Sequence, residues 1–348
     1  MATVKINVSK EYDIEIGRNL IDKAGEFVKR FPKIKKIAVI TDDIVDALYA
    51  DKVIKSLKKE NFEVIKYVIP NGEQSKNSDN FVDILNFLAK NELTRTDCVF
   101  ALGGGVVGDL AGFCAATYLR GIKFIQCPTT LLAMVDSSVG GKTAIDLKSG
   151  KNLAGAFYQP DFVICDCDTL ESLKEETFTD GCAEIIKYGA ISDEKLLLHL
   201  KEKGKNFDLE NVIKRCVELK CETVTADEFD TGLRQLLNFG HTIAHSIEAL
   251  SNYKTTHGKA VAIGMAIISE ACFKNGLCEK SVSDEIIEVI EKFNLPTKTD
   301  YTVDDMLSII KNDKKRKGDT ITIVIPEKRG KCVLKTIPLN EMKALLNA

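Results

Sequence analysis

Three of the four histidines in this 348-residue chain fall within 17 residues, and two of them share the run RQLLNFGHTIAHSIEAL (234–250). Read as one helix, this run repeats polar residues at steps of 4, 3, 4 and 3, so that they share one face: Arg234, Asn238, His241, His245 and Glu248. The intervening residues are mostly apolar, which is typical of a buried helix. An unpaired buried polar group costs about 1–3 kcal/mol, so this polar face is a candidate site for a metal or a ligand.

A second candidate ligand lies in the segment DGCAEIIKYGAI (180–191), where Glu184 and Lys187 stand one turn apart on an otherwise apolar helix. A buried carboxylate needs a cation or a metal as partner. One carboxylate and two imidazoles with an open position make up many catalytic zinc sites. His241 and His245 have the spacing of two histidines that bind one zinc from a single helix, whereas a site that uses His257 draws ligands from three helices.

A glycine-rich turn, GGGVVG at 103–108, follows an apolar strand-like run and opens a helix. Glycines let the backbone approach a pyrophosphate, and the helix N-terminus favours the anion. The turn follows a later strand rather than the first, and the next strand ends in Pro128, Thr129 and Thr130 instead of an acidic residue. We therefore expect a nucleotide site on a Rossmann-like sheet with a non-standard arrangement.

The segment 129–157 is rich in hydroxyl, acidic and basic side chains around a Gly-Gly turn. Its part VGGKTAID reads as a tight turn that joins two short extended pieces. Lysines beside glycines and hydroxyls suit the binding of phosphate or carboxylate, although a solvated surface loop has the same composition. The polar side chains in question are Asp136, Ser137, Ser138, Lys142, Asp146, Lys151 and Asn152.

Hydrophobic patterns place these segments on two kinds of structure. The N-terminal part begins with a strand pair at 1–17 and then alternates strands with helices, which predicts a mostly parallel sheet; the later strands are expected at 35–41, 62–69, 98–103, 123–128 and 162–166. Ligands of such sheets bind beyond the carboxyl ends of the strands. Helical periods dominate from about residue 178, followed by a strand pair near 320–336 and a last helix. We expect an α/β domain at 1–170 and a mainly α-helical domain at 171–348.

Composition excludes several classes of protein. A net charge of −3 gives no electrostatic reason to bind nucleic acid or an anionic membrane, and no stretch approaches the roughly 20 apolar residues of a membrane span. The N-terminus lacks the apolar segment of a secretory signal, so we expect a cytoplasmic protein. The eleven cysteines form no CxxC pair, which indicates reduced thiols in the core.

Taken together, these segments resemble the 3-dehydroquinate synthase family over nearly the whole chain. The matching blocks, in the family's order, are PNGEQSKN, GGGVVGDLAGFCAATYLRG, CPTTLLAMVDSSVGGKTAID, GKNLAGAFYQP, GCAEIIKYGA, LNFGHTIAHSIEA, HGKAVAIGM and NDKK. The resemblance implies an N-terminal NAD-binding domain, a helical C-terminal domain with the active site in the cleft between them, and a homodimer. It also implies a sugar phosphate substrate and a divalent metal, Zn²⁺ or Co²⁺.

The resemblance also assigns residues. As metal ligands it implies Glu184, His241 and His257. As NAD contacts it implies Asp42, Glu73, Lys76, Gly104, Gly105, Val106, Asp109, Thr129, Thr130, Lys142, Lys151, Thr169 and Ser172. As catalytic and substrate-site residues it implies Asp136, Lys142, Lys151, Asn152, Lys187, Lys220, Arg234, Asn238, His245 and a late lysine, Lys314 or Lys315. Arg120 resembles an arginine that reaches the site of the neighbouring subunit.

The family's reaction converts 3-deoxy-D-arabino-heptulosonate 7-phosphate to 3-dehydroquinate and phosphate, with NAD restored in each turnover. The chain departs from the family pattern at Asp230 (usually Glu), Ala244 (usually Gly), Tyr158 (commonly His) and Ser172 (usually Thr). The alternatives are another sugar phosphate cyclase, such as a 2-deoxy-scyllo-inosose or valiolone-type synthase, and a metal-dependent polyol dehydrogenase. A dehydrogenase would release NADH, and a non-catalytic metal-binding protein would leave the lysine-rich loop without a purpose.

Overall fold

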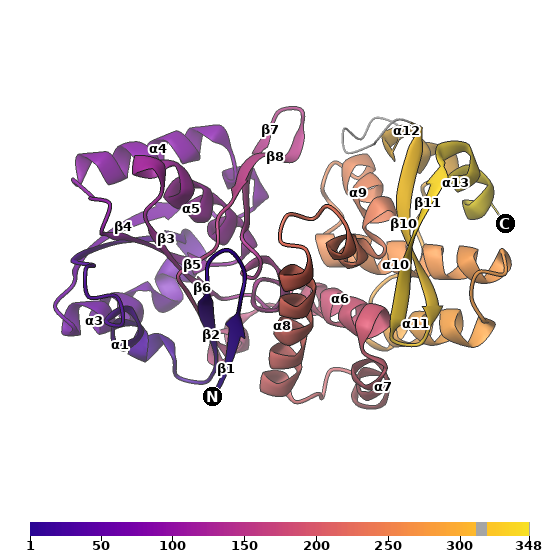
Figure 1. The fold of residues 1–348 in the computed structure, drawn as a ribbon, viewed down its shortest axis with the longest axis horizontal. Coiled ribbons are helices and arrows are strands. Elements are labelled where there is room, and N and C mark those ends of the chain that lie inside the picture. The colour runs from indigo at the N-terminus through magenta and orange to yellow at the C-terminus, as the bar shows by residue number, and fades with distance from the viewer. Residues whose placement is uncertain (311–318, 348) are drawn as a thin grey trace. The chain divides into compact units, whose positions relative to one another are not determined.

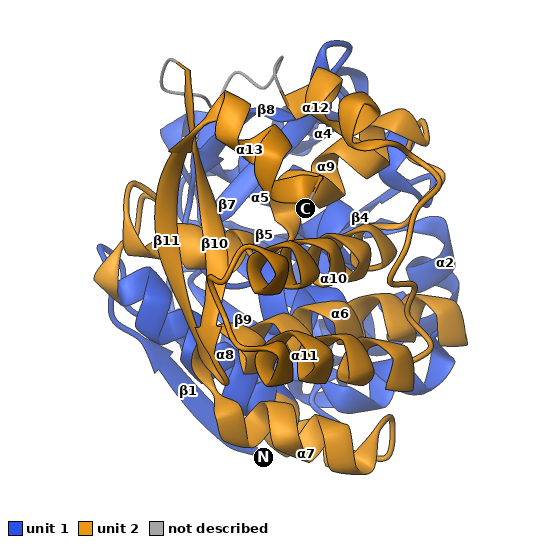
Figure 2. Ribbon diagram, turned by 90° about the vertical axis from the view of Figure 1, so that its right-hand side faces the viewer, with its two compact units in different colours: residues 1–173, 213–225 blue, residues 174–212, 226–348 orange. Residues whose placement is uncertain are grey.

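The computed structural model describes residues 1–310 and 319–347 of the chain. The chain forms two compact units (Figure 2): unit 1 comprises residues 1–173 and 213–225, and unit 2 comprises residues 174–212 and 226–348. These units differ from the expected domains 1–170 and 171–348 mainly in the segment 213–225, which belongs to unit 1 although it follows the first helices of unit 2. The domain boundaries from the sequence stay a prediction.

Unit 1 is built on a seven-stranded sheet with the order β1-β2-β9-β6-β5-β3-β4. Only β1 is antiparallel to its neighbour; the other pairs are parallel, as expected from the alternation of strands and helices. The strands are β1 (Ala2–Ile6), β2 (Tyr12–Gly17), β3 (Lys36–Asp42), β4 (Glu63–Ile69), β5 (Cys98–Gly103), β6 (Lys123–Pro128) and β9 (Phe162–Asp166).

The sheet of unit 1 is buried on both faces, because successive apolar side chains of a central strand point to opposite faces and pack into different apolar clusters. In β5, Phe100 and Leu102 join one apolar cluster with residues of α1 (Ala24–Val28) and α3 (Asp51–Lys59). Val99 and Ala101 join the opposite cluster with residues of α4 (Ser78–Lys90) and α5 (Gly105–Thr117). Figure 1 shows these two helix pairs on opposite faces of the sheet. A strand that is buried on both sides reads as a continuous apolar run, which is the pattern CVFALG.

The other elements of unit 1 follow the strands. A separate hairpin, β7 (Lys142–Leu147) and β8 (Gly150–Phe157), carries the lysine-rich segment. The helices are α1 (Ala24–Val28), α2 (Asp43–Val45), α3 (Asp51–Lys59), α4 (Ser78–Lys90), α5 (Gly105–Thr117) and most of α8 (Leu209–Ala226). Short 3₁₀ or π turns are η1 (Ile21–Lys23), η2 (Asp46–Ala50), η3 (Glu73–Ser75), η4 (Tyr118–Arg120), η5 (Ala133–Ser137) and η6 (Cys167–Ser172).

Unit 2 is mainly helical and contains the strand pair expected near 320–336. Its helices are α6 (Glu175–Ser192), α7 (Glu194–Lys203), α9 (His241–Leu250), α10 (His257–Lys274), α11 (Lys280–Lys292), α12 (Val303–Ile310) and α13 (Leu339–Leu346), with the 3₁₀ turn η7 (Leu233–Asn238) and the hairpin β10 (Thr320–Lys328) and β11 (Lys331–Pro338). Helix α10 is apolar around most of its girth because it lies in the core of this unit, where it packs on α9, α6 and α11.

One predicted element is wrong. The run 234–250 is not a single helix: it consists of η7, a break at Phe239 and Gly240, and α9 beginning at His241. Gly240 has φ +77°, and a Cβ atom there would lie 2.7 Å from the backbone nitrogen of Met265. Both the left-handed backbone and the close approach to α10 therefore require glycine at this position. His241, His245 and Glu248 keep their common face on α9, but Arg234 and Asn238 belong to a different turn.

Within the described ranges of the chain, no helix combines the length and the apolar character that crossing a membrane requires.

Candidate active site

Unit 2 brings together a carboxylate and two imidazoles from three different helices. Glu184 lies in the middle of α6, while His241 and His257 are the first residues of α9 and α10. One ligand atom from each residue lies within 4.8 Å of the others. Among the residues that the structure describes, this is the group of three or more His, Cys, Asp and Glu side chains whose spacing could hold a metal ion.

The distances from Glu184 to the two histidines fit a tetrahedral metal better than they fit charge-assisted hydrogen bonds. Glu184 Oε1 lies 3.5 Å from His241 Nε2 and 3.4 Å from His257 Nε2. Metal–ligand bonds of about 2.0–2.1 Å in a tetrahedron separate neighbouring ligand atoms by roughly 3.3–3.4 Å. A charge-assisted hydrogen bond would bring the same atoms to about 2.7–2.9 Å. The donor set therefore fits Zn²⁺ or Co²⁺, and three protein ligands on a tetrahedral ion would leave its fourth position to another ligand.

Each imidazole has a second contact that fixes its orientation. His241 Nδ1 lies 3.1 Å from the carbonyl oxygen of Phe239, and His257 Nδ1 lies 3.6 Å from Glu248 Oε1. Both contacts leave Nε2 turned toward Glu184. Metal-binding histidines commonly use the other ring nitrogen in this way, because it fixes the tautomer and the ring plane. The sequence pattern singled out Glu248 but gave no indication that it meets His257.

Buried charges set the protonation of the cluster. Burial, and then the positive charge of Lys187, lower the pKa of His241 to about 3. Burial also disfavours the charged form of His257, but the carboxylates of Glu184 and Glu248 outweigh it and raise its pKa to about 10. Lys187 forms a close ion pair with Glu184, and both side chains are almost fully buried. The structure thus pairs these two residues, three positions apart on α6.

The remaining candidates in unit 2 have different surroundings. His245 is exposed, and its ring centroid lies 5.7 Å from that of His241, so it stands beside the cluster without joining it. Arg234 is only 1% exposed; its Nη1 donates to the carbonyl oxygen of Glu228, and its backbone nitrogen donates to Asp227.

Asn238 is exposed at the end of η7. The candidates Lys314 and Lys315 lie outside the described residues.

In unit 1, the cofactor candidates gather at the carboxyl ends of neighbouring parallel strands. Asp42 ends β3, the glycine turn follows β5, and Thr129 follows β6, in the spatial order β3-β5-β6. Asp42 Oδ1 already accepts hydrogen bonds from the backbone nitrogens of Ile44 and Val45. This edge is where ligands of open parallel sheets bind.

The glycine turn leaves little room for side chains. Gly104 is the N-cap of α5, and a Cβ atom there would lie 3.1 Å from Thr130 Cγ2. A Cβ atom on Gly105 would lie 3.1 Å from Ser137 Oγ. Val106 is partly buried in the first turn of α5. The first backbone nitrogens of a helix have no partner within the helix, so the start of α5 suits an anion such as the pyrophosphate of a dinucleotide.

A buried lysine links the segment before α4 to the hairpin. Lys76 is 4% exposed, and its Nζ donates to Asp109 Oδ2 and to Asn152 Oδ1, both at 2.6 Å. Burial opposes its charge, but Asp109 and Glu73 outweigh that effect and raise the pKa of Lys76. Lys151 Nζ lies 3.6 Å from Glu73 Oε1. Five candidates from distant parts of the sequence thus form one polar group.

The other candidates of unit 1 lie on α8, β7, η4 and η5. Lys220 in α8 donates to Asp136 Oδ1 at 2.8 Å. Lys142 is exposed at the first residue of β7, directly after Gly140 and Gly141, which both have positive φ. Arg120 is exposed in η4 and has φ +65°.

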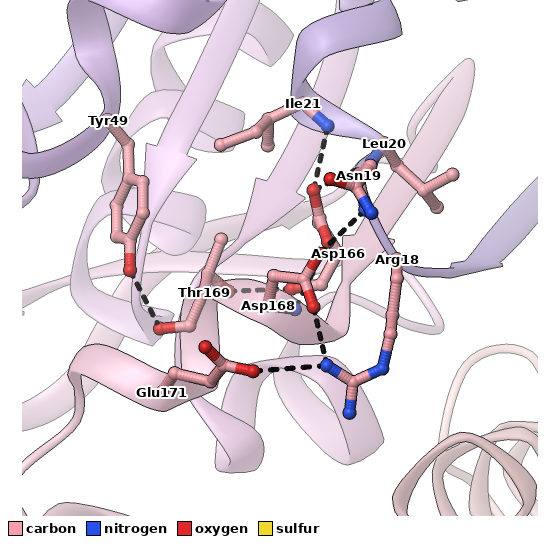
Figure 3. Close-up of polar contacts among 9 residues, drawn as sticks. All are labelled: Arg18, Asn19, Leu20, Ile21, Tyr49, Asp166, Asp168, Thr169 and Glu171. Carbon is pink, nitrogen blue, oxygen red and sulfur yellow. Dashed lines mark hydrogen bonds and ion pairs between the residues drawn. The ribbon is translucent and has the colours of Figure 1, made fainter.

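Two further candidates, Thr169 and Ser172, lie just after β9, and Figure 3 shows the polar contacts of Thr169. Thr169 is fully buried; its hydroxyl donates to the carbonyl oxygen of Asp166 at 2.8 Å, and its own carbonyl accepts from Tyr49 Oη at 3.1 Å. Tyr49 Oη also lies 2.6 Å from Ser172 Oγ. The structure therefore gives Thr169 and Ser172 partners within the protein.

Sequence reasoning missed Asp180 of unit 2. This residue lies one turn before Glu184 on α6, and its carboxylate contacts the first turn of α10. The spacing of four residues indicates that Asp180 and Glu184 share a face of α6. Nothing in the local pattern indicates that Asp180 contacts Thr256, 76 positions later.

Comparison with known proteins identifies the family of these features. A family model described as 3-dehydroquinate synthase N-terminal matches residues 66–180, and one described as 3-dehydroquinate synthase C-terminal matches residues 181–316. A 3-dehydroquinate synthase of Streptococcus suis is 45% identical over 342 residues, which is 96% of both chains. One of Enterococcus faecalis is 42% identical over 342 residues, covering 97% of this chain and 96% of that protein.

Solved structures show how widely the fold is shared. A 2-deoxy-scyllo-inosose synthase complexed with carbaglucose-6-phosphate, NAD⁺ and Co²⁺ matches with a TM-score of 0.89 at 23% identity and covers 99% of both chains. An iron-containing alcohol dehydrogenase matches with a TM-score of 0.67 at 13% identity, over 98% of this chain and 97% of that one. The cyclase and dehydrogenase alternatives therefore share the fold, while the more similar sequences share a single name.

Proposed function

The chain belongs to the 3-dehydroquinate synthase family, and we propose which of its residues take each role in the family's reaction. That reaction converts 3-deoxy-D-arabino-heptulosonate 7-phosphate to 3-dehydroquinate and phosphate with catalytic NAD and a divalent metal. The observation that carries the assignment is the cluster of Glu184, His241 and His257, whose spacing fits a metal site with an open position.

Glu184, His241 and His257 hold the metal, which when bound supplies a Lewis acid for substrate hydroxyls. The contacts of Phe239 with His241 and of Glu248 with His257 keep the two rings oriented. Lys187 lies against Glu184 and supplies a buried positive charge beside this site. We assign Lys187 to the binding of the anionic substrate, together with Arg234 and Asn238.

The carboxyl edge of the unit 1 sheet binds NAD, which when bound takes a hydride from the substrate and returns it in the same turnover. Gly104, Gly105 and Val106 present backbone nitrogens to the pyrophosphate. The support for this assignment is the pair of glycines at the start of α5, where an added Cβ atom would lie 3.1 Å from Thr130 or Ser137. The other residues that we assign to this cofactor are Asp42, Glu73, Lys76, Asp109, Thr129, Thr130, Lys142, Lys151, Thr169 and Ser172.

The substrate carries a phosphate and a carboxylate, and lysines supply matching charge. Lys142 is exposed beside two glycines, so its ammonium group can reach an anion without displacing bulky neighbours. We assign Lys142, Lys151 and Asn152 to the anionic groups, and Lys220 with its partner Asp136 to the same substrate. Lys314 or Lys315 is proposed as a further phosphate contact, and Arg120 as a contact made in the neighbouring subunit of a homodimer.

His245 moves a proton in this scheme. It shares a face of α9 with the ligand His241 but is exposed and outside the metal cluster. An imidazole has a pKa close to the working pH, so it can take the proton of a substrate hydroxyl and return it later. Oxidation of the substrate at C5 makes the neighbouring C6–H acidic, which allows the phosphate to leave by elimination.

The decisive experiment is to mix the protein with the heptulosonate phosphate, NAD and zinc and to follow three products. We expect inorganic phosphate and a cyclic product in equal amounts, with no net NADH. NADH formed in step with substrate consumption, without phosphate, would instead identify a polyol dehydrogenase.

We also propose that the protein works in the cytoplasm as a homodimer that binds neither nucleic acid nor membrane. The net charge of −3 supports the absence of those partners. Sedimentation analysis of the purified protein tests the subunit number, because a dimer doubles the mass of 38.4 kDa.

A further inference from the structure

The N-terminus of α10 has an unusual cap. Thr256 occupies the N-cap position with extended backbone, and threonine commonly caps a helix by accepting a hydrogen bond from a backbone nitrogen two or three residues later. Here the side chain of Thr256 makes no such bond. Its hydroxyl donates instead to Asp180 Oδ1 on α6, at 2.5 Å. The usual capping group is thus turned toward another helix.

The carboxylate of Asp180, which lies on α6, accepts the capping hydrogen bond in place of the Thr256 side chain. The same Oδ1 atom accepts a hydrogen bond from the backbone nitrogen of Lys259 at 3.1 Å, so one carboxylate binds residues on both sides of His257. A carboxylate at this end also interacts favourably with the helix dipole. Lys259 Nζ forms an ion pair with Glu176, which lies one turn before Asp180 on α6.

The two helix backbones meet at this point. A Cβ atom built on Gly258 would lie 2.0 Å from the carbonyl oxygen of Asp180. Only glycine permits so close an approach between α6 and the first turn of α10. The junction lies next to His257 in the sequence and one helical turn from Glu184 on α6. Asp180 and Glu184 are four residues apart and therefore share a face of α6.

We propose that Asp180 is a positioning residue for the metal site, acting through His257. The carboxylate locks Thr256 and Lys259 to α6 and so fixes where the first residue of α10 places its ring relative to Glu184. This inference rests on the proposed metal ligands. Loss of the lock lets the first turn of α10 fray, because the end of a helix depends on its cap for order. His257 then samples positions beyond the reach of the metal.

The test compares Asp180→Ala with a matched control, Asp193→Ala. Asp193 caps α7 in the same unit by accepting a hydrogen bond from the backbone nitrogen of Leu196 at 3.0 Å, and it is not one of the three residues of the metal cluster found in the described part of the chain. The zinc dissociation constant is measured by competition with a chromophoric chelator, using full-length protein and zinc alone. We expect Asp180→Ala to weaken zinc binding by about 10–100-fold and Asp193→Ala to leave it unchanged. Equal zinc affinity in both variants overturns the proposal.

A double-mutant cycle shows whether Asp180 acts through His257. Removing Asp180 in a His257→Ala background should cause no further loss of zinc affinity, whereas an additional loss of the same size would mean that Asp180 acts by another route. His257→Ala also separates this inference from the ligand assignment. Normal zinc affinity in that variant defeats the proposed metal site itself, while normal affinity in Asp180→Ala alone defeats only the positioning role.

Two milder variants guard against misfolding. Asp180→Asn keeps an oxygen that can accept from the backbone nitrogen of Lys259, and we expect it to retain most of the zinc affinity. Thr256→Val removes the hydroxyl that donates to Asp180, and we expect an intermediate loss. The visible spectrum of the Co²⁺-loaded proteins gives a second readout, because displacement of one imidazole changes the ligand field. Identical spectra and affinities in the wild type and all Asp180 and Thr256 variants contradict the proposal.

Discussion

Substitution of the histidines of unit 2 can distinguish residues that bind the metal from a residue that transfers a proton. We predict that His241→Ala and His257→Ala lose zinc, whereas His245→Ala keeps it but turns over slowly. In the structure, Nε2 of His241 and Nε2 of His257 lie 3.5 and 3.4 Å from the same atom, Glu184 Oε1. Each ring can therefore supply a separate ligand to one metal ion. His245 stands outside this cluster.

The expected size of the loss follows from the number of ligands. Zinc sites with four protein ligands bind with an apparent free energy of about 10–16 kcal/mol, or roughly 2.5–4 kcal/mol for each ligand. Removing one ring should therefore weaken zinc binding by roughly 10²–10³-fold. Removing a proton relay should leave the zinc affinity intact and lower the rate by about 10²–10⁴-fold.

The assay is metal analysis of the purified variants, followed by measurement of phosphate release at saturating zinc. His199→Ala is the matched control, because this fourth histidine lies on α7 of the same unit and outside the metal cluster. We expect it to keep both zinc and rate. Zinc lost from His245→Ala and kept in His257→Ala would refute the assignment and favour a site built from two histidines on one helix.

Three further predictions test other parts of the molecule. Lys142→Ala should lower activity by about 10–150-fold, the worth of one charge-assisted hydrogen bond, whereas the exposed Lys58→Ala on α3 should not; equal activities would make the hairpin lysine structural. If Arg120 acts in the neighbouring subunit, a mixture of Arg120→Ala and Lys142→Ala chains, each of lowered activity, should be more active than either variant alone; no recovery after proven subunit exchange would place Arg120 elsewhere. Asp97 accepts hydrogen bonds from Lys36 and Thr94, which outweigh burial and lower its pKa. Its contribution to the free energy of unfolding is therefore present above the unfolded pKa of about 3.9 and lost as the pH falls through the lower folded value. Asp97→Asn should flatten acid unfolding below about pH 4, and an unchanged acid transition would contradict this.

Much of the fold could be predicted from local patterns, because burial on both faces of a sheet leaves a signature in the sequence. The run CVFALG predicted β5, and its alternating side chains do enter two separate apolar clusters. The same kind of pattern failed at 234–250, where a helical period continues across Phe239 and Gly240 although the helix does not. Periodicity reports which residues could share an apolar face, but it does not detect the break at Phe239 and Gly240, because the spacing of polar residues continues across it.

The sequence by itself determined the types of ligand in this protein: an acidic residue on an apolar helix, histidines at helical spacing, and a glycine turn after a buried strand. Only the tertiary structure decided which of them meet. Glu184 joins His241 and His257 rather than a histidine pair on α9, because α10 approaches α6 at Gly258 and the segment before α9 at Gly240. Such approaches depend on packing between segments far apart in the chain, and local propensity carries no information about that distance.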